Sequence, residues 1–225
     1  MSASPAWTQS GVAGLHVLAD DDPRWPVGPV AQAKAACQGG AAVVQLRTKH
    51  ATDRQTLAWA RSIRALTRRA GVLFILNDRF DLALAAEADG VHLGQSDFPP
   101  ARLPESARER LTVGYSTHNI EQAIAAATEP VDYVAFGPVF GTGSKDSPYG
   151  PRGLEALELA SRAVAPRPLV AIGGISRSNL TAVLAAGAAG AAVISAVAAA
   201  GEPAAATRAL VQLWAPESFR AEPSP

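Results

Sequence analysis

The sequence predicts an α/β protein built as a single closed (β/α)8 barrel, the TIM-barrel arrangement. Three observations lead to this prediction. The chain has 225 residues, an ordinary length for one barrel of this kind. Eight short apolar segments alternate with helical segments, and glycine or polar residues follow the apolar ones. The segments recur about every 25 residues, and this period and count fit a closed barrel better than the alternative, an open doubly wound sheet.

The first half of the chain supplies four strands and three clear helices. The strands are expected at residues 15–19, 42–46, 72–76 and 90–94. The helices are expected at residues 30–38, 53–69 and 82–88. The helix at 53–69 has the clearest pattern, because apolar residues recur on one face and arginines lie on the other.

The second half repeats the alternation. Its strands are expected at residues 111–115, 131–136, 169–172 and 191–194. Its helices are expected at residues 121–127, 154–164, 179–186 and 204–214. The barrel should occupy residues 14–215, between an N-terminal extension at 1–13 and a frayed tail at 216–225. In such a barrel the catalytic groups lie on loops at the carboxyl ends of the strands.

Composition excludes several classes of function. Twenty basic and twenty acidic residues cancel, so no broad field attracts nucleic acid or an anionic membrane. The single cysteine, Cys37, cannot form an internal disulfide, and no segment has the character of a signal peptide or a membrane span. We therefore expect a cytoplasmic protein with small-molecule partners. The sequence leaves open whether the chain forms a homo-oligomer.

Two aspartates follow neighbouring strands. Asp78 comes directly after the third strand and Asp97 closely after the fourth. Because the carboxyl ends of parallel strands lie at one edge, the two carboxylates should lie side by side. Such a pair suits Mg²⁺, which commonly binds one or two carboxylates together with substrate phosphates. The alternative is that both are loop or helix-capping aspartates.

The end of the second strand carries donors for an anion. Gln45, Arg47 and Lys49 alternate with other residues, so they are expected to point together into the barrel mouth. An amide, a guanidinium and an ammonium on one face would bind oxyanions. A solvated basic strand end is the alternative.

Two further regions have the composition of phosphate sites. The loop after the sixth strand, FGPVFGTGSK, combines glycines with the hydroxyls of Thr142 and Ser144 and the charge of Lys145. The seventh strand is followed by the pair Gly173-Gly174, and the eighth strand ends at Ile194, which Ser195 follows. Barrels of this kind often bind phosphate at these two strand ends.

The remaining polar residues do not form a recognisable catalytic triad. Ser116 lies in GYSTH, which lacks the second glycine of a nucleophile elbow, so we interpret Ser116 as a hydrogen-bond donor to phosphate. His118 is expected to be structural or capping, with proton transfer as the alternative. His92 is expected to be a hydrogen-bonded histidine inside the barrel. Neither a dinucleotide fingerprint nor a Walker loop is present in the sequence.

The motifs together resemble the thiamine-phosphate synthase family over nearly the whole chain. They are QLRTK, LNDRFDLALAAEADGVHLGQSD, GYSTH, DYVAFGPVFGTGSK, LVAIGGI and VISA, in this order. The resemblance implies a (β/α)8 barrel that joins a hydroxymethylpyrimidine diphosphate to a thiazole phosphate and releases pyrophosphate with Mg²⁺. It implies that the pyrimidine carbon–oxygen bond breaks first and that the thiazole nitrogen then attacks.

The resemblance also implies a role for each matching residue. Asp78 and Asp97 would hold Mg²⁺, and the catalytic groups would be Arg47, Lys49, Ser116 and Lys145. The pyrimidine diphosphate would contact Gln45, Arg47, Lys49, Asn77, Ser116 and Lys145. The thiazole phosphate would contact Thr142, Ser144, Gly174, Ile194 and Ser195.

Three positions depart mildly from the family pattern: Thr48, Gly141 and Ser144. Two alternative functions follow from the same fold. One is a thiazole tautomerase, a sister family that uses a histidine near His118 as base and tends to lose the Asn-Asp pair and the HLGQ-x-D segment. The other is a non-catalytic sensor of phosphate ligands, which would not need the pair Asp78 and Asp97.

Overall fold

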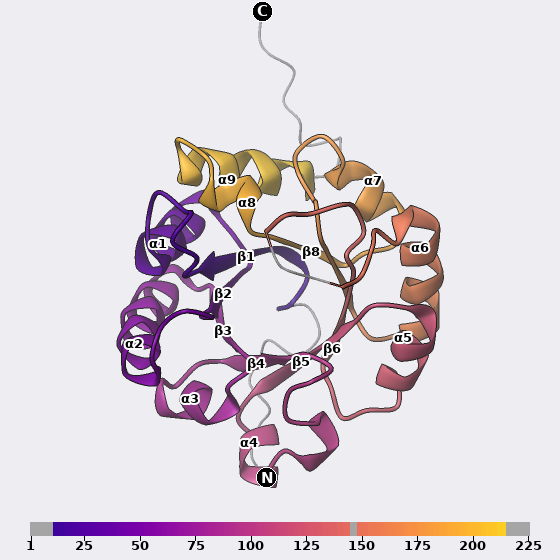
Figure 1. Cartoon of the computed structure of the whole chain (residues 1–225), viewed down its shortest axis with the longest axis horizontal. Coiled ribbons are helices and arrows are strands. Elements are labelled where there is room, and N and C mark those ends of the chain that lie inside the picture. The colour runs from indigo at the N-terminus through magenta and orange to yellow at the C-terminus, as the bar shows by residue number, and fades with distance from the viewer. Residues whose placement is uncertain (1–10, 145–147, 215–225) are drawn as a thin grey trace, which may run out of the picture.

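The computed structural model describes residues 11–144 and 148–214. Its eight strands are all parallel and pair in chain order, and β8 pairs with β1 to close the barrel (Figure 1). The helices form a ring around the strands (Figure 1). The predicted (β/α)8 barrel is therefore confirmed, and the alternative of an open sheet is wrong.

The strands lie close to their predicted positions. Their bounds are β1 Gly14–Asp20, β2 Val43–Arg47, β3 Leu73–Asn77, β4 Gly90–Leu93, β5 Thr112–Thr117, β6 Tyr133–Phe136, β7 Leu169–Ile172 and β8 Gly190–Val193. The largest difference is at β5, which extends two residues further than expected. Ser116 consequently lies within a strand instead of after it.

The helices agree less closely with their predicted bounds. They are α1 Pro29–Gly39, α2 Asp53–Ala70, α3 Phe80–Ala85, α4 Glu105–Arg108, α5 Ile120–Ala126, α6 Gly153–Val164, α7 Leu180–Ala185, α8 Ser195–Ala198 and α9 Pro203–Val211, with 3₁₀ turns at Pro100–Arg102 and Gln212–Trp214. Two short helices, α4 and α8, and the 3₁₀ turn at Pro100–Arg102 were not predicted. Each has only three or four residues, too few for a periodic pattern to show.

Helix α2 shows how local sequence sets these bounds. Thr52 caps its start, because the Thr52 hydroxyl accepts a hydrogen bond from the Gln55 N–H at 3.3 Å. Gly71, in the left-handed conformation with φ 67°, ends it. Ala60 and Ile63 are fully buried against the barrel, while arginines cover the outer face.

The core has two layers because strand residues alternate between the inside and the outside of the barrel. The larger layer lies between strands and helices and includes Leu46, Phe74 and Val134. The smaller layer fills the barrel interior, and its members include Leu18, Val43, Ile75, Tyr133, Ala135, Val170 and Ala192. The interior is thus a packed, largely apolar core that also holds the buried side chains of His16 and His92.

The expected N-terminal extension and C-terminal tail lie largely or wholly outside the described residues. Within residues 11–144 and 148–214, no helix combines the length and the apolar character that crossing a bilayer requires.

Candidate functional site

The predicted acid pair lies together at the mouth of the barrel. Asp78 follows β3 directly, and its backbone N–H donates to the His92 carbonyl of β4 at 2.7 Å. Asp97 follows β4, and its carboxylate accepts a hydrogen bond from the Gly94 N–H at 2.6 Å. Burial raises the pKa of Asp97, and contact with the Asp78 carboxyl raises the pKa further. The two acids are therefore near neighbours, as the strand order predicts.

The alternative reading of these aspartates fits only in part. Asp97 does hold its own loop through the Gly94 N–H. Asp78 caps no helix, because Arg79 is the N-cap residue of α3 and makes no side-chain capping bond. Asp78 instead adopts the left-handed conformation, with φ 68°. A non-glycine residue held in this way indicates a local constraint, which is common at functional sites.

The residues of this pair fit a divalent cation. The Lys49 ammonium lies 2.5 Å from an oxygen of Asp78, so one positive charge faces two carboxyl groups. Carboxylate oxygens are the hard ligands that Mg²⁺ prefers. Among the described residues, no group of three or more His, Cys, Asp or Glu side chains could hold a metal ion. A cation bound here would therefore take further ligands from water or from substrate phosphates.

Arg47 and Gln45 point into the barrel mouth as predicted. Gln45 is buried, and Arg47 at the end of β2 keeps 14% of its side chain exposed. Arg47 donates to the Asp20 carboxylate at 2.5 Å. Lys49 lies beyond the end of β2, so the alternation of side chains along a strand does not explain its direction as predicted. Its contact with Asp78 shows that it lies at the same rim.

A hydrogen-bonded chain runs from the barrel interior to Ser116. The Tyr133 hydroxyl lies 2.9 Å from His92 Nδ1, and His92 Nε2 lies 2.8 Å from Ser116 Oγ. Gln95 donates to the Ser116 carbonyl at 2.6 Å. His92 is the hydrogen-bonded barrel histidine that we expected. The contact of His92 with Ser116 was not predicted, because it depends on how β4 pairs with β5.

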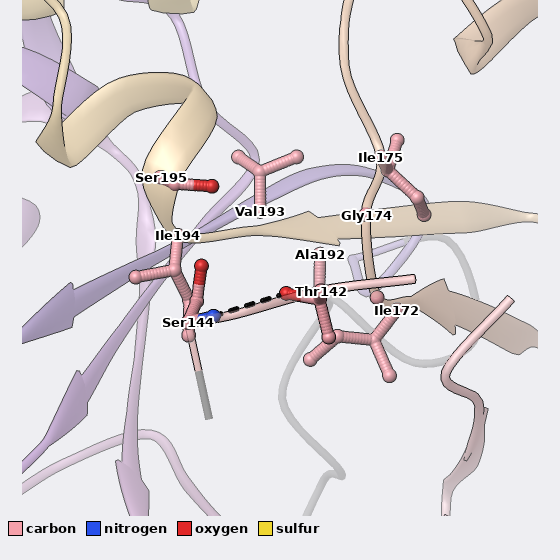
Figure 2. A pocket seen from close by; sticks show the side chains of 10 residues that line it. Thr142, Ser144, Ile172, Gly174, Ile175, Ala192, Val193, Ile194 and Ser195 are labelled. Atoms are coloured by element: carbon pink, nitrogen blue, oxygen red, sulfur yellow. Dashed lines mark hydrogen bonds between the residues drawn. The ribbon is translucent and has the colours of Figure 1, made fainter. Parts of the chain in front are cut away.

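The predicted phosphate residues line a pocket on the other side of the mouth (Figure 2). The pocket is formed by Thr142, Ser144, Ile172, Gly173, Gly174, Ile175, Ala192, Val193, Ile194 and Ser195. Thr142 Oγ1 accepts a hydrogen bond from the Ser144 N–H at 3.2 Å, which fixes the loop that bears both hydroxyls. Ser195 begins α8, and Ile194 is its N-cap residue.

Two glycines let the loop after β6 pack against the end of β7. Gly173 and Gly174 both have positive φ, 101° and 62°. A Cβ atom at Gly173 would lie 2.5 Å from Pro138 Cα, and one at Gly174 would lie 2.5 Å from the Gly141 carbonyl oxygen. Glycine is therefore required twice here, for conformation and for space.

His118 is held by its surroundings. Its Nδ1 lies 2.7 Å from the Gly137 carbonyl oxygen, and its ring stacks on Tyr149 with centroids 4.0 Å apart. The expected capping role belongs instead to Asn119, whose side chain accepts from the Gln122 N–H at 2.8 Å at the start of α5.

The structure thus brings the described candidate residues to one rim, in two groups. The acid pair, Gln45, Arg47, Lys49, Asn77 and Ser116 lie at the ends of β2 to β5, and the pocket that Thr142, Ser144, Gly174, Ile194 and Ser195 help to line lies at the ends of β6 to β8. Lys145 lies outside the described residues. Asp20 was not predicted as a site residue. Its place at the end of the first apolar segment could have indicated that it lies at the rim, but its position opposite Arg47 depends on the pairing of β1 with β2.

Comparison with known proteins gives one consistent family. The family model described as thiamine monophosphate synthase matches residues 10–197. The thiamine-phosphate synthase of Chlorobium luteolum is 43% identical over 199 residues, which cover 88% of this chain and 92% of that protein. The thiamine-phosphate synthase of Chloroflexus aurantiacus is 48% identical over 177 residues, covering 79% of this chain and 81% of that protein.

A solved structure agrees with the sequence relatives. The thiamine phosphate pyrophosphorylase of Pyrococcus furiosus superposes with a TM-score of 0.80 at 35% identity, covering 91% of this chain and 96% of that one. More distant barrels, such as a 3-hexulose-6-phosphate synthase at 18% identity and a TM-score of 0.59, share the fold.

Proposed function

The chain belongs to the thiamine monophosphate synthase family, and from this premise we propose which reaction it catalyses and which residues take part. The reaction joins 4-amino-5-hydroxymethyl-2-methylpyrimidine diphosphate to hydroxyethylthiazole phosphate. The products are thiamine phosphate and pyrophosphate, so the enzyme is a transferase. The observation that supports this assignment most strongly is that an acid pair, two cations and a phosphate pocket meet at one barrel mouth.

The acid pair forms the metal site in this proposal. Asp78 and Asp97 would hold Mg²⁺, whose charge would screen the diphosphate as it leaves. Lys49 already lies 2.5 Å from Asp78, so it is placed to contact both the acid pair and the diphosphate. Burial, and after it the neighbouring Asp78 carboxyl, raises the pKa of Asp97, and a divalent cation bound between the two acids would favour the ionised form.

The cations bind the leaving diphosphate. When the pyrimidine carbon–oxygen bond breaks, negative charge grows on the departing oxygen, and groups that contact it more strongly at that moment lower the barrier. Arg47 and Lys49 come from the end of β2 and the loop after it, and we assign them this role together with Lys145. Gln45 and Asn77 complete the pyrimidine diphosphate site.

The chain from Tyr133 to Ser116 supplies a donor of fixed direction. Burial raises the pKa of Tyr133 well above its usual value, so its hydroxyl keeps its proton. If Tyr133 donates to His92 Nδ1, the imidazole carries its proton on Nε2 and donates it to Ser116 Oγ. The serine proton is then left to point at the diphosphate.

The pocket at the ends of β6 to β8 holds the thiazole phosphate. Thr142, Ser144 and Ser195 contribute hydroxyls, while the glycine turn at Gly174 and the chain at Ile194 contribute backbone. Anchoring the phosphate here would place the thiazole ring toward the pyrimidine, and positioning of this kind removes much of the entropic cost of joining two molecules.

One assay tests the function. The protein is incubated with both substrates and Mg²⁺, and pyrophosphate and thiamine phosphate are measured. We expect stoichiometric formation of the two products, dependent on both substrates. A protein that binds both substrates and forms neither product would support the phosphate-sensor alternative and overturn the proposal.

The tautomerase alternative makes a different prediction in the same assay. It requires His118 to act as base and the thiazole phosphate to isomerise without any pyrimidine substrate. The stacking of His118 on Tyr149 and its bond to the Gly137 carbonyl give it a sufficient structural role. A cytoplasmic location stays a prediction from the sequence, and whether the chain forms a homo-oligomer stays open.

A further inference from the structure

Asp20 is a buried carboxylate at the rim of the barrel mouth. It ends β1, its side chain is fully buried, and both of its carboxylate oxygens accept hydrogen bonds. Its backbone is fixed as well, because the Gln32 side chain accepts from the Asp20 N–H at 2.9 Å and donates to the Asp20 carbonyl at 3.0 Å. A buried charge needs such partners, so its position is closely determined.

One carboxylate oxygen faces Arg47. Oδ2 accepts from the Arg47 guanidinium at 2.5 Å, and the two residues lie directly opposite each other in the pairing of β1 with β2. A guanidinium is planar, with its donors in a rigid fork, so holding one of its nitrogens restricts the direction of the other donors. Asp20 thereby sets how Arg47 is presented to the mouth.

The other oxygen holds the loop between β1 and α1. Oδ1 accepts from the Trp25 indole N–H at 2.8 Å and from the Asp22 backbone N–H at 3.0 Å. The neighbouring Arg24 lies 5.5 Å from the centre of the Trp25 ring and donates to the Gly143 carbonyl at 2.7 Å. Gly143 belongs to the loop that carries Thr142 and Ser144, so these contacts run from Arg47 across to the phosphate pocket.

We infer that Asp20 is a positioning residue for the diphosphate site and acts through Arg47. The same carboxylate connects this site with the loop between β1 and α1, which in turn contacts the loop that carries Gly143. The inference rests on the proposed function, since it takes Arg47 as a ligand of the diphosphate. It makes a prediction opposite to that of simple electrostatics. The negative charge of Asp20 repels an anion, so its removal should strengthen diphosphate binding unless Asp20 is needed to orient Arg47.

The test is Asp20→Asn, with calorimetric titration of inorganic pyrophosphate in the presence of Mg²⁺. The asparagine oxygen can still accept from Trp25 and Asp22, while its amide presents donors to the donors of Arg47. We expect binding to weaken by about tenfold, which corresponds to about 1.4 kcal/mol, and kcat to fall with it. Unchanged or tighter pyrophosphate binding by the folded variant would overturn the inference.

A double-mutant cycle shows whether the effect passes through Arg47. In an Arg47→Gln background, Asp20→Asn should weaken pyrophosphate binding less than twofold further. An effect as large as in the wild type would contradict the inference. Asp20→Glu serves if Asp20→Asn does not fold, because it keeps the charge and moves the oxygen. Weaker binding by Asp20→Glu supports positioning, and unchanged binding refutes it.

Asp89→Asn is the matched control. Asp89 also pairs with an arginine, Arg64, at 2.7 Å, but it precedes β4 and so lies at the opposite end of the barrel. Its replacement should leave pyrophosphate binding within twofold. Failure of the inference and failure of the proposed function are distinguishable. If the wild-type protein binds no pyrophosphate and forms no thiamine phosphate, both fall; if it does both and Asp20→Asn binds equally, only the inference falls.

Discussion

At the scale of single residues, the contact between Asp78 and Asp97 opposes stability. Partial burial disfavours the ionised form of Asp97, and the neighbouring Asp78 carboxyl disfavours it further, so both raise the pKa of Asp97. The Lys49 ammonium compensates only in part, since 46% of its side chain is exposed to solvent. This combination is characteristic of a binding site for a cation.

The first prediction concerns Asp97→Asn. The pKa of Asp97 is raised in the folded protein, so its ionised form opposes folding at neutral pH, and this opposition disappears as pH falls through the raised pKa. The variant should therefore unfold at a higher temperature than wild type at pH 7 without Mg²⁺. Turnover should fall at least about a hundredfold, because a metal ligand is lost.

Thermal unfolding followed by circular dichroism from pH 4 to 8 checks the stability, and pyrophosphate release over a range of Mg²⁺ concentrations checks the activity. Asparagine can still accept from the Gly94 N–H, so the loop contact is preserved. A folded Asp97→Asn variant with the wild-type rate and wild-type Mg²⁺ dependence would refute the metal assignment.

The second prediction separates charge from stability at Lys49. Its ion pair with Asp78 is half exposed, so Lys49→Met should change the free energy of unfolding by less than about 1 kcal/mol. We expect kcat/KM for the pyrimidine diphosphate to fall by about a hundredfold, because a cation is lost where charge develops. The control is Lys34→Met on the exposed face of α1, which should leave both quantities unchanged. Steady-state kinetics and urea unfolding measure them.

Residue types in the sequence indicated most of the candidate site, but they did not reveal which side chains contact one another. Asp78, Asp97, Arg47 and Ser116 were identifiable because each occurs near the end of an apolar segment. Asp20 also ends such a segment, yet its role depends on a guanidinium from the next strand. Contacts of this kind arise from strand register, which a single sequence does not specify directly.

At the scale of elements, the turn after β7 shapes the pocket in which we propose that the thiazole phosphate binds. Gly173 and Gly174 allow the loop after β6 to lie against them, and hydrogen bonds from Val139 and Phe140 to the carbonyls of Ile172 and Gly173 secure that contact. The pocket therefore depends on two loops that are far apart in the chain, since Thr142 and Gly174 are 32 positions apart.

The third prediction is that Gly174→Ala damages this pocket. A methyl group there would meet the Gly141 carbonyl oxygen at 2.5 Å, and the backbone would be strained at φ 62°. We expect the free energy of unfolding to fall by about 1–3 kcal/mol and KM for the thiazole phosphate to rise by about tenfold. Gly201→Ala is the matched control, because no atom lies within 4 Å of the added methyl group. An unaltered KM for the thiazole phosphate would contradict the assigned pocket.

The sequence predicted long elements better than short ones. The helix expected at residues 53–69 is found at Asp53–Ala70, because its apolar face repeats over several turns. The region between β4 and β5 was not assigned, and it contains the 3₁₀ turn Pro100–Arg102 and the single turn α4. Tertiary packing stabilises such short turns, and the local sequence pattern does not show this packing.

At the scale of the whole molecule, the two ends of the barrel have different tasks. The carboxyl ends of the strands carry the candidate site, whereas the opposite end carries contacts that hold the fold. Asp89, just before β4, accepts from the Phe74 N–H at 2.9 Å and from Arg64 at 2.7 Å. Phe74 is itself fully buried between strands and helices.

The fourth prediction compares an aspartate from each end. Asp89→Asn weakens a largely buried ion pair and should lower the free energy of unfolding by about 1–3 kcal/mol, with kcat and both KM values within twofold of wild type. Asp78→Asn should do the reverse, reducing turnover by about a hundredfold or more while the protein stays folded. Chemical denaturation and initial-rate kinetics on the same preparations make the comparison. An active Asp78→Asn or an inactive, folded Asp89→Asn would contradict the division between the ends.

The closed barrel itself followed from the number and spacing of apolar segments. Eight segments each followed by polar residues fit one architecture well, and strand pairing in chain order confirms it. The contacts that cross the mouth, such as that of Arg24 with Gly143, could not be foreseen, because they join loops 119 positions apart.

The packed interior of the barrel has a kinetic consequence. Within the described residues, Tyr133 and the apolar side chains around it fill the barrel interior, and the candidate site lies at the carboxyl ends of the strands. Both substrates of the proposed reaction would enter, and both products would leave, at this end of the barrel. Pyrophosphate must therefore leave before the next pyrimidine diphosphate can bind. Product release, rather than the chemical step, can then limit the rate of turnover.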